Sequence, residues 1–307
     1  MFFPEQQVFD ITRVTLQKLN HPIFVEKGIE TDVLRLDMLH PVVSGNKWFK
    51  LKYHIQTAIE QERKGIITFG GAWSNHIVAT AFLCSKVGLR SKAVIRGEKP
   101  KHFSQTLNDA IQYGMELIFI SRDEYENKDM VKNRLDIEES DFVIVPEGGQ
   151  SHLGIQGAKE ILKLIPQESY QYIACSIGTG TMMAGLLQAS TGIAELLGFC
   201  SLKIEKTGNN DLKNFIRENS DGKKYSIFYD YHFGGYAKKN KALIDFMNQL
   251  YNQCQVPTDF VYTGKLMYGI TDLVRHDHLS RGSRICIIHS GGLQGNRSLN
   301  AGILRFG

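Results

Sequence analysis

The stretch SGNKWFKL at residues 44–51 contains Lys47, the residue to which the other motifs of the chain are related. Apolar side chains recur after it at helical spacing, at Trp48, Leu51, Ile55 and Ala58. An amphipathic helix is therefore expected to begin here, with Gly45 adopting the angles of the turn and Asn46 capping the helix. Lys47 then lies in the first helical turn, where the positive end of the helix disfavours a second positive charge.

This position predicts a lowered pKa for the Lys47 amine, and the neutral amine is the form that attacks a carbonyl carbon. A solvated surface lysine at a helix start explains the same local pattern. The lysine alone does not separate the two interpretations, so the rest of the chain has to decide.

Size and composition are those of an ordinary globular protein. The 307 residues suffice for two domains or one large α/β unit, and 42% are hydrophobic and 22% charged. Basic runs at residues 99–102 and 238–241 are short and indicate solvated faces, so no nucleic-acid partner is expected. The net charge of +4 would still attract an anionic cofactor or substrate.

Several features point to a cytoplasmic protein. No apolar run reaches the roughly 18 residues of a membrane span, and the N-terminus lacks a signal-peptide pattern. The five cysteines never occur as C-x-x-C and are expected to be reduced: Cys84, Cys175, Cys200, Cys254 and Cys286. His276 and His278 flank Asp277, but no further ligand is spaced for a metal, so no metal site is predicted.

Strand and helix patterns alternate along the chain. Strands are expected at 65–69, 91–96, 116–120, 142–145, 172–176, 198–200, 225–230 and 284–289, after an extended segment at 29–39. Helices are expected at 74–87, 104–113, 122–137, 153–165, after 181, at 240–253 and at 264–275. This alternation predicts an α/β fold with doubly wound parallel sheets.

A glycine-threonine turn, Gly178-Thr179-Gly180-Thr181, lies between a buried strand and a helix. Such a turn directs backbone N–H groups and hydroxyls at one point near a positive helix end, which is how phosphate is held. Its spacing matches neither the G-x-G-x-x-G pattern nor the NTPase loop. A plain turn that requires glycine is the alternative.

Three further features fall in loops that follow strands or flank helices. The stretch Ser74-Asn75-His76 begins a helix and could bind a carboxylate or merely cap the helix. The stretch Ser290-Gly291-Gly292 follows the last strand, where open α/β sheets bind ligands. Tyr236 and Tyr262 flank glycines and could serve a site or simply pack. Together with the lysine, these features fit an enzyme that carries pyridoxal 5′-phosphate on a lysine.

The motifs resemble those of the 1-aminocyclopropane-1-carboxylate deaminase / D-cysteine desulfhydrase family, in the tryptophan synthase β-like group of pyridoxal phosphate enzymes. The resemblance runs from about Leu34 to the C-terminus. It rests on Gly45-Asn46-Lys47-x-x-Lys50-Leu51, Gly70-Gly71-x-x-Ser74-Asn75-His76, Tyr262-Thr263-Gly264-Lys265, His289-Ser290-Gly291-Gly292 and the loop at 178–181.

The resemblance implies roles for individual residues. Lys47 would hold the cofactor and move the Cα proton, acting with Ser74, Tyr236 and Tyr262 as the catalytic set. The other cofactor-binding residues would be Lys50, Asn75, Gly178, Thr179, Gly180, Thr181 and Ser290, with Lys50 near the phosphate and Ser290 by the pyridine nitrogen. The substrate would be held by Ser74, Asn75, His76, Tyr236 and Tyr262.

The resemblance also implies a domain organisation. A small domain at residues 49–151 would be inserted into a large cofactor-binding domain formed by residues 1–48 and 152–307. A homodimer and a small amino-acid substrate are expected by the same analogy.

Two positions depart from the deaminases of this family. Thr263 stands where they carry Glu, and Ser290 stands where they carry Leu; desulfhydrases have Thr and a hydroxyl residue there. A neutral hydroxyl does not keep the pyridine nitrogen protonated as a carboxylate would. The sequence therefore favours β-elimination from a D-amino acid such as D-cysteine, giving pyruvate, sulfide and ammonia. The alternatives are 1-aminocyclopropane-1-carboxylate deaminase activity and a catalytically idle pyridoxal-binding protein.

Overall fold

Two sheets organise the computed structural model, which describes residues 8–126, 131, 141–204 and 211–306. One sheet has six strands in the order β1-β2-β10-β7-β8-β9, and the other has four in the order β5-β4-β3-β6. The predicted α/β architecture with parallel sheets is confirmed. Among the described residues, no helix has both the length and the apolar character needed to cross a membrane.

The six-stranded sheet joins the beginning and the end of the chain. Its strands are β1 (Leu16–Lys18), β2 (Glu30–Arg35), β7 (Tyr172–Ile177), β8 (Glu195–Cys200), β9 (Tyr225–Phe228) and β10 (Arg284–His289). β10 lies between β2 and β7, parallel to both, so Ile287 pairs with Val33 on one side and Ala174 on the other. Only β1 is antiparallel to its neighbour among these described strands. The carboxyl ends of β2, β7 and β10 therefore meet at one edge.

The four-stranded sheet is entirely parallel and comes from one stretch of chain. Its strands are β3 (Gly65–Gly70), β4 (Arg90–Arg96), β5 (Glu116–Ile120) and β6 (Phe142–Val145). All four fall within residues 49–151, whereas the six-stranded sheet takes its strands from either side of that stretch. We propose that the two sheets are the cores of the inserted small domain and the large domain.

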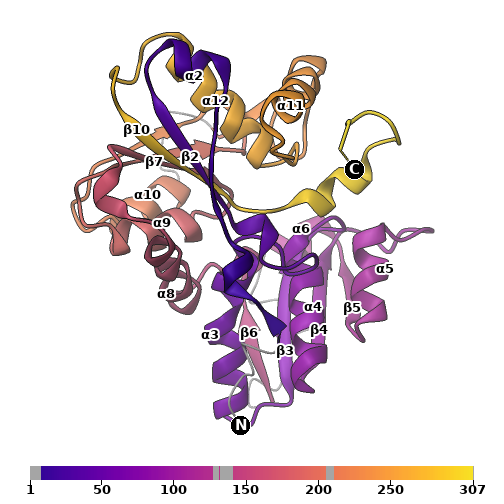
Figure 1. The fold of residues 1–307 in the computed structure, drawn as a ribbon. Coiled ribbons are helices and arrows are strands. Elements are labelled where there is room, and N and C mark those ends of the chain that lie inside the picture. The colour runs from indigo at the N-terminus through magenta and orange to yellow at the C-terminus, as the bar shows by residue number, and fades with distance from the viewer. Residues whose placement is uncertain (1–7, 127–130, 132–140, 205–210, 307) are drawn as a thin grey trace.

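Helices cover both faces of the large sheet. Figure 1 shows α2, α11 and α12 on one face and α8, α9 and α10 on the other. The helices are α2 (Pro22–Glu26), α3 (Lys47–Glu60), α4 (Asn75–Val87), α5 (Gln105–Gln112), α6 (Arg122–Glu126), α8 (His152–Lys159), α9 (Thr181–Ala189), α10 (Asp211–Glu218), α11 (Lys241–Cys254) and α12 (Thr263–Arg275).

Several predicted elements differ in detail. The strand expected over 225–230 ends at Phe228, and the one expected over 198–200 begins at Glu195. The extended segment expected over 29–39 ends at Arg35, because a 3-10 turn at Leu36–Met38 redirects the chain towards the lysine. The helix expected over 153–165 is α-helical only to Lys159 and continues as the 3-10 segment Glu160–Leu164. Of the helix expected over 122–137, α6 accounts for residues 122–126; residues 127–130 and 132–137 lie outside the described residues.

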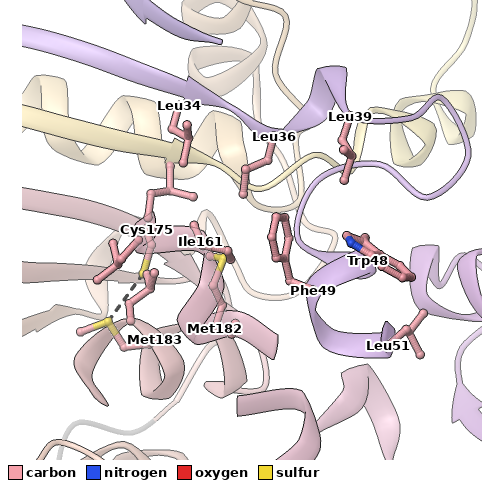
Figure 2. Packing of buried hydrophobic residues seen from close by; sticks show 14 of the residues in the cluster. Leu34, Leu36, Leu39, Trp48, Phe49, Leu51, Ile161, Cys175, Met182 and Met183 are labelled. Atoms are coloured by element: carbon pink, nitrogen blue, oxygen red, sulfur yellow. Dashed lines mark hydrogen bonds between the residues drawn. The ribbon is translucent and has the colours of Figure 1, made fainter. Parts of the chain in front are cut away.

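Helix α3, which begins at Lys47, packs tightly against the helices of the large sheet. A Cβ atom at Gly157 of α8 would lie 1.6 Å from the Phe49 carbonyl oxygen, and one at Gly185 of α9 would lie 2.5 Å from the Cβ atom of Ala158. Glycine at both positions therefore permits a close helix–helix approach. Figure 2 shows the core around this contact, with Phe49 lying between Leu36 and the helices below it.

The cysteines are free, as predicted. Cys84, Cys175, Cys200 and Cys286 are buried, and Cys254 is partly buried. Cys175 donates to the Met183 sulfur at 3.5 Å within the same core (Figure 2). Burial raises the pKa of these buried thiols even where Lys50 lies near Cys175 and Lys265 near Cys200, which suits small hydrophobic residues rather than reactive thiols.

Candidate active site

The turn that carries Lys47 is fixed against the turn that follows β10. Gly45 has a φ of +69°, and a Cβ atom there would lie 1.9 Å from the Ser290 carbonyl oxygen. The Asn46 N–H donates to that same oxygen at 3.1 Å. Gly45 is thus required both by its backbone angle and by the close approach of the two chains. Gly45 and Asn46, from near the start of the sequence, thus contact Ser290, from near its end, and all three belong to predicted site motifs.

Asn46 occupies the N-cap position of α3 but makes no side-chain cap hydrogen bond, so that prediction is wrong. Its Oδ1 instead accepts from the Lys47 Nζ atom at 2.6 Å, and its Nδ2 lies 3.2 Å from the Met182 sulfur. Asn46 thereby holds the Lys47 amine in place.

The lowered pKa expected for Lys47 is present, but its main cause differs. Burial lowers the pKa of the Lys47 amine to about 8, and the carboxylate of Asp259 partly opposes this shift. Desolvation disfavours the charged ammonium form. The amine is therefore available in its nucleophilic form close to neutral pH.

Ser290 lies at the carboxyl edge of the sheet beside a second hydroxyl. The Ser290 Oγ atom is 3.0 Å from the Ser176 Oγ atom at the end of β7, and both side chains are buried. Behind them, His289 is fully buried, with its Nε2 atom 2.7 Å from the Pro257 oxygen and its Nδ1 atom 3.2 Å from Asp37. Burial alone would raise the pKa of Asp37, but His289 and neighbouring Arg35 outweigh it and lower the pKa.

The predicted phosphate loop has the backbone of an anion site. Gly180 has a φ of +82° and is the N-cap residue of α9, so the first N–H groups of that helix face out of the turn. A Cβ atom there would lie 2.8 Å from the end of the Leu212 side chain, which would have to shift, so the backbone angle is the main reason for glycine. The Thr179 and Thr181 hydroxyls are 2.9 Å apart.

Lys50 lies near this loop, across the turn that follows β6. A Cβ atom at Gly148 would lie 2.7 Å from Thr179, and one at neighbouring Gly149 would lie 3.2 Å from the Lys50 Cβ atom. Burial, together with the nearby Lys47 ammonium, lowers the pKa of the Lys50 amine to about 7. Placing a dianionic phosphate in the loop would reverse that shift and stabilise the ammonium form.

Residues 74–76 begin α4 with their polar groups available. Ser74 is the N-cap residue, but its hydroxyl makes no cap hydrogen bond, unlike an ordinary capping serine. The Asn75 Nδ2 atom lies 3.5 Å from the Gly292 oxygen, and its buried Oδ1 atom has no partner among the described residues. A buried, unsatisfied oxygen of this kind is the expected mark of a missing ligand.

His76 is neutral and can only accept at its free nitrogen. Its Nε2 atom is 2.9 Å from the Thr68 hydroxyl, which donates to the Val145 oxygen, so this hydrogen-bond network places the ring proton on Nε2. The buried Nδ1 atom has no partner in the described part of the chain. Burial and the nearby Lys47 and Lys50 hold the pKa of His76 well below its ordinary value. A bound carboxylate would therefore meet the backbone N–H groups of this turn rather than a donated imidazole proton.

Tyr236 and Tyr262 lie together as a pair. Their ring centroids are 6.0 Å apart in an edge-to-face arrangement. A Cβ atom at Gly178 of the phosphate loop would lie 3.1 Å from the Tyr262 ring. Burial, the neighbouring phenol and the carboxylates of Asp259 and Glu147 raise the pKa of Tyr262 well above its ordinary value. Both phenols thus keep their protons at neutral pH.

Asp259 was not anticipated from the sequence. It is fully buried and its carboxylate accepts from the N–H groups of Val261, Tyr262 and Thr263 and from the Thr263 hydroxyl, at 2.7–2.9 Å. An Asp three residues before Tyr262 at a helix start is a capping signal that could have revealed it. A carboxylate thus does lie next to Tyr262, but its oxygens are directed at the backbone of α12.

These features fit pyridoxal phosphate. The lysine has a lowered pKa, the turn at 178–181 has the backbone of an anion site, and buried polar atoms of Asn75 and His76 lack partners among the described residues. The sheet edge brings Lys47, Ser290, Asn75 and the phosphate loop to one place, in contact through the pairs described above. The fold and the site together define a pyridoxal-phosphate enzyme of the tryptophan synthase β-like class.

Comparison with known proteins identifies the family. The model of the family described as pyridoxal-phosphate dependent enzyme matches residues 21–291, and the chain belongs to that family. The protein therefore uses pyridoxal phosphate as its cofactor.

Individual relatives support the resemblance seen in the motifs. A Pyrococcus horikoshii protein with the provisional name 1-aminocyclopropane-1-carboxylate deaminase is 28% identical over 285 residues, covering 88% of this chain and 86% of the relative. The bifunctional D-cysteine desulfhydrase/1-aminocyclopropane-1-carboxylate deaminase of Arabidopsis thaliana is 27% identical, covering 87% and 73%. The D-cysteine desulfhydrase of Salmonella typhi is 26% identical, covering 86% and 87%.

Solved structures agree. The crystal structure of an ACC deaminase homologue superposes with a TM-score of 0.77 at 26% identity, covering 92% of this chain and 90% of that one. Threonine deaminase isoform 2 of Solanum lycopersicum shares the fold at 13% identity, with a TM-score of 0.67 and coverage of 94% and 86%.

Proposed function

We propose that this enzyme catalyses β-elimination on a small amino acid, most readily D-cysteine, which together with one water molecule gives pyruvate, sulfide and ammonia. Pyridoxal phosphate, when bound, withdraws electrons from the Cα atom of a substrate amine attached to it. Lys47 would hold the cofactor and then, once released by the substrate, take the Cα proton on its Nζ atom. The lowered pKa of Lys47 supports this use as a base at neutral pH.

Other residues would bind and orient. The loop at 178–181 and Lys50 would hold the phosphate, Asn75 the cofactor's ring oxygen, and residues 74–76 the substrate carboxylate through N–H groups and the Ser74 hydroxyl. Tyr262 and Tyr236, protonated at neutral pH, would face the substrate side chain, where a phenol can donate a proton to a departing thiolate.

The observation that carries the choice of reaction is the pair of hydroxyls at Ser290 and Ser176, 3.0 Å apart. Ser290 would lie by the pyridine nitrogen, and neither hydroxyl can keep that nitrogen protonated as a carboxylate would. Negative charge at Cα is then less stabilised. A reaction in which a good leaving group departs from Cβ tolerates this best, whereas opening a cyclopropane ring needs stronger assistance.

Ring opening of 1-aminocyclopropane-1-carboxylate is the second candidate, and Asp259 is the observation in its favour. Its carboxylate touches the backbone of Tyr262 and Thr263. However, the Thr263 hydroxyl donates to Asp259, so neither group is directed at the tyrosine hydroxyl where assistance to ring cleavage would be needed.

Steady-state assays on one preparation test the proposal. Purified enzyme is given D-cysteine, L-cysteine and 1-aminocyclopropane-1-carboxylate, and keto acid and ammonia are measured, with Lys47→Ala as the background control. We expect the highest kcat/KM for D-cysteine. A higher kcat/KM for the cyclopropane substrate would overturn the assignment, and no turnover of any β-substituted amino acid would favour an idle binding protein.

We also infer a cytoplasmic homodimer. The free cysteines support a reducing compartment, and the dimer rests on the family resemblance. Sedimentation of the holoenzyme measures the oligomeric state directly.

A further inference from the structure

The loop that carries Tyr236 has an unusual backbone. Phe233, Gly234, Gly235 and Ala237 all have positive φ angles, of 51°, 96°, 121° and 54°. Two of these four residues have side chains, for which the left-handed region is unfavourable. Such a segment keeps one conformation only when its surroundings hold it there.

A buried ammonium group holds this loop. Lys265 is 1% exposed, and its Nζ atom donates to the Gly235 carbonyl oxygen at 2.8 Å. The same oxygen accepts from the Lys238 N–H at 3.1 Å, so one carbonyl oxygen, in the residue before Tyr236, accepts both hydrogen bonds. Burial lowers the pKa of Lys265 to about 8, against the opposing effects of Asp259 and Cys200. A buried amine is costly, so its retention calls for an explanation.

Lys265 also lies close in sequence to the other tyrosine. It lies in the first turn of α12, three residues after Tyr262, and the Leu266 N–H bonds the Tyr262 oxygen to continue that turn. Asp259 fixes the start of the same turn. Lys265 therefore connects a rigid helix start, which presents Tyr262, to a strained loop, which presents Tyr236.

We propose that Lys265 is a positioning residue that sets the place of the Tyr236 hydroxyl against Tyr262, and thereby the rate of turnover. The proposal rests on the proposed function in one respect, namely that the two tyrosines face the substrate. Lys265 would act through the Gly235 carbonyl group, to which its amine donates.

A double-mutant cycle tests the catalytic part. Lys265→Met keeps the apolar stem and removes the donor, and we expect it to lower kcat/KM by about 10- to 100-fold in the wild-type background. In a Tyr236→Phe background the same change should lower kcat/KM by less than about threefold, because the effects of substitutions at interacting residues do not add. Equal losses in both backgrounds would overturn the proposal. Lys241→Met, on the exposed face of α11, is the matched control and should change neither value.

Hydrogen exchange tests, without any substrate, whether the Lys265 amine holds the loop at residues 233–238. In apo-enzyme carrying Lys265→Met, amides in the peptide covering 233–238 should exchange at least about tenfold faster, while peptides of β10 stay unchanged. Unchanged exchange at 233–238 would show that the Lys265 amine does not hold the loop. If Lys265→Met fails to fold, Lys265→Gln replaces it, with the same expected directions. Because this measurement needs no turnover, it decides on Lys265 even if the proposed substrate is wrong.

Discussion

The two sides of the site are built by different kinds of contact. On the cofactor side, which comprises residues 44–47, 178–181 and 290–292, backbone meets backbone: the Asn46 N–H reaches the Ser290 oxygen, and glycines permit the approach. On the tyrosine side, comprising residues 233–237 and 259–265, side chains hold the loops: Asp259 caps the helix start and Lys265 secures Gly235. If these sides bind cofactor and substrate as proposed, cofactor binding depends on backbone contacts of the fold, while the tyrosine side can change by single side-chain substitutions.

Lys47→Ala should have the largest effect, because it removes the group proposed to bind the cofactor and to move the proton. We expect a loss of at least about 1,000-fold in kcat. The visible absorbance of lysine-linked cofactor should disappear as well. If borohydride still fixes cofactor covalently to another lysine of the variant, Lys47 is not the attachment site.

Gly45→Ala tests the backbone contact on the cofactor side. The added Cβ atom would overlap the Ser290 oxygen, so the two turns must separate, and cofactor affinity should fall by about 100-fold or more. Gly88→Ala is the control, since Gly88 also has a positive φ, of 73°, but has nothing within 4 Å of an added Cβ atom. It should cost only about 1 kcal/mol of unfolding free energy and leave affinity unchanged. Equal affinity losses in both variants would mean that strain, not the contact, matters.

Tyr262→Phe tests the tyrosine side. Removing the hydroxyl should lower kcat by about 10- to 100-fold, because one proton donor is lost, while cofactor affinity stays within about twofold. Steady-state kinetics measure kcat, and absorbance titration of the same preparation measures cofactor affinity. A parallel loss of cofactor would show that the two sides are not independent.

The pKa of Lys47 predicts a pH dependence confined to the cofactor side. Since only the neutral amine attacks a carbonyl group, the rate at which apo-enzyme takes up cofactor should rise about tenfold per unit up to a pH of about 8 and level off above it. With an ordinary lysine pKa of 10.5 the rise would continue through pH 9. Stopped-flow absorbance from pH 6.5 to 9.5 distinguishes a Lys47 pKa of about 8 from one of 10.5.

Ser176→Ala should have the smallest effect. It leaves Ser290 in place but removes its hydroxyl partner, so a change of about two- to fivefold in kcat is expected, from one lost hydrogen bond. Thermal unfolding of the holoenzyme should shift by only a few degrees. A loss as large as that of Tyr262→Phe would show that the hydroxyl pair has a direct part in the chemistry.

The sequence predicted the cofactor side better than the tyrosine side, for a physical reason. Glycine turns between apolar strands and helices have local signatures, so the turns at 44–47, 178–181 and 290–292 were located correctly, whereas the binding of phosphate at 178–181 stays a prediction. The roles of Ser176 and Lys265 depend on contacts between distant segments, such as that between Ser176 and Ser290, which are 114 residues apart. No local pattern encodes those contacts. The side chain of Asn46 illustrates the limit: its position as N-cap was predictable, but its bond to Lys47 was not.

The bond between Asn46 and Ser290 has a consequence for the order in which the protein matures. The lysine turn leaves the ribosome before β10 and the turn after it, which follow about 240 residues later. At about 5–20 residues per second, the interval is roughly 10–50 s. During that time the Lys47 turn lacks the Ser290 backbone opposite it, so under the proposed function a nascent chain would not yet bind its cofactor. Uptake of pyridoxal phosphate would then mark the completion of folding, and chains broken off before β10 would remain colourless.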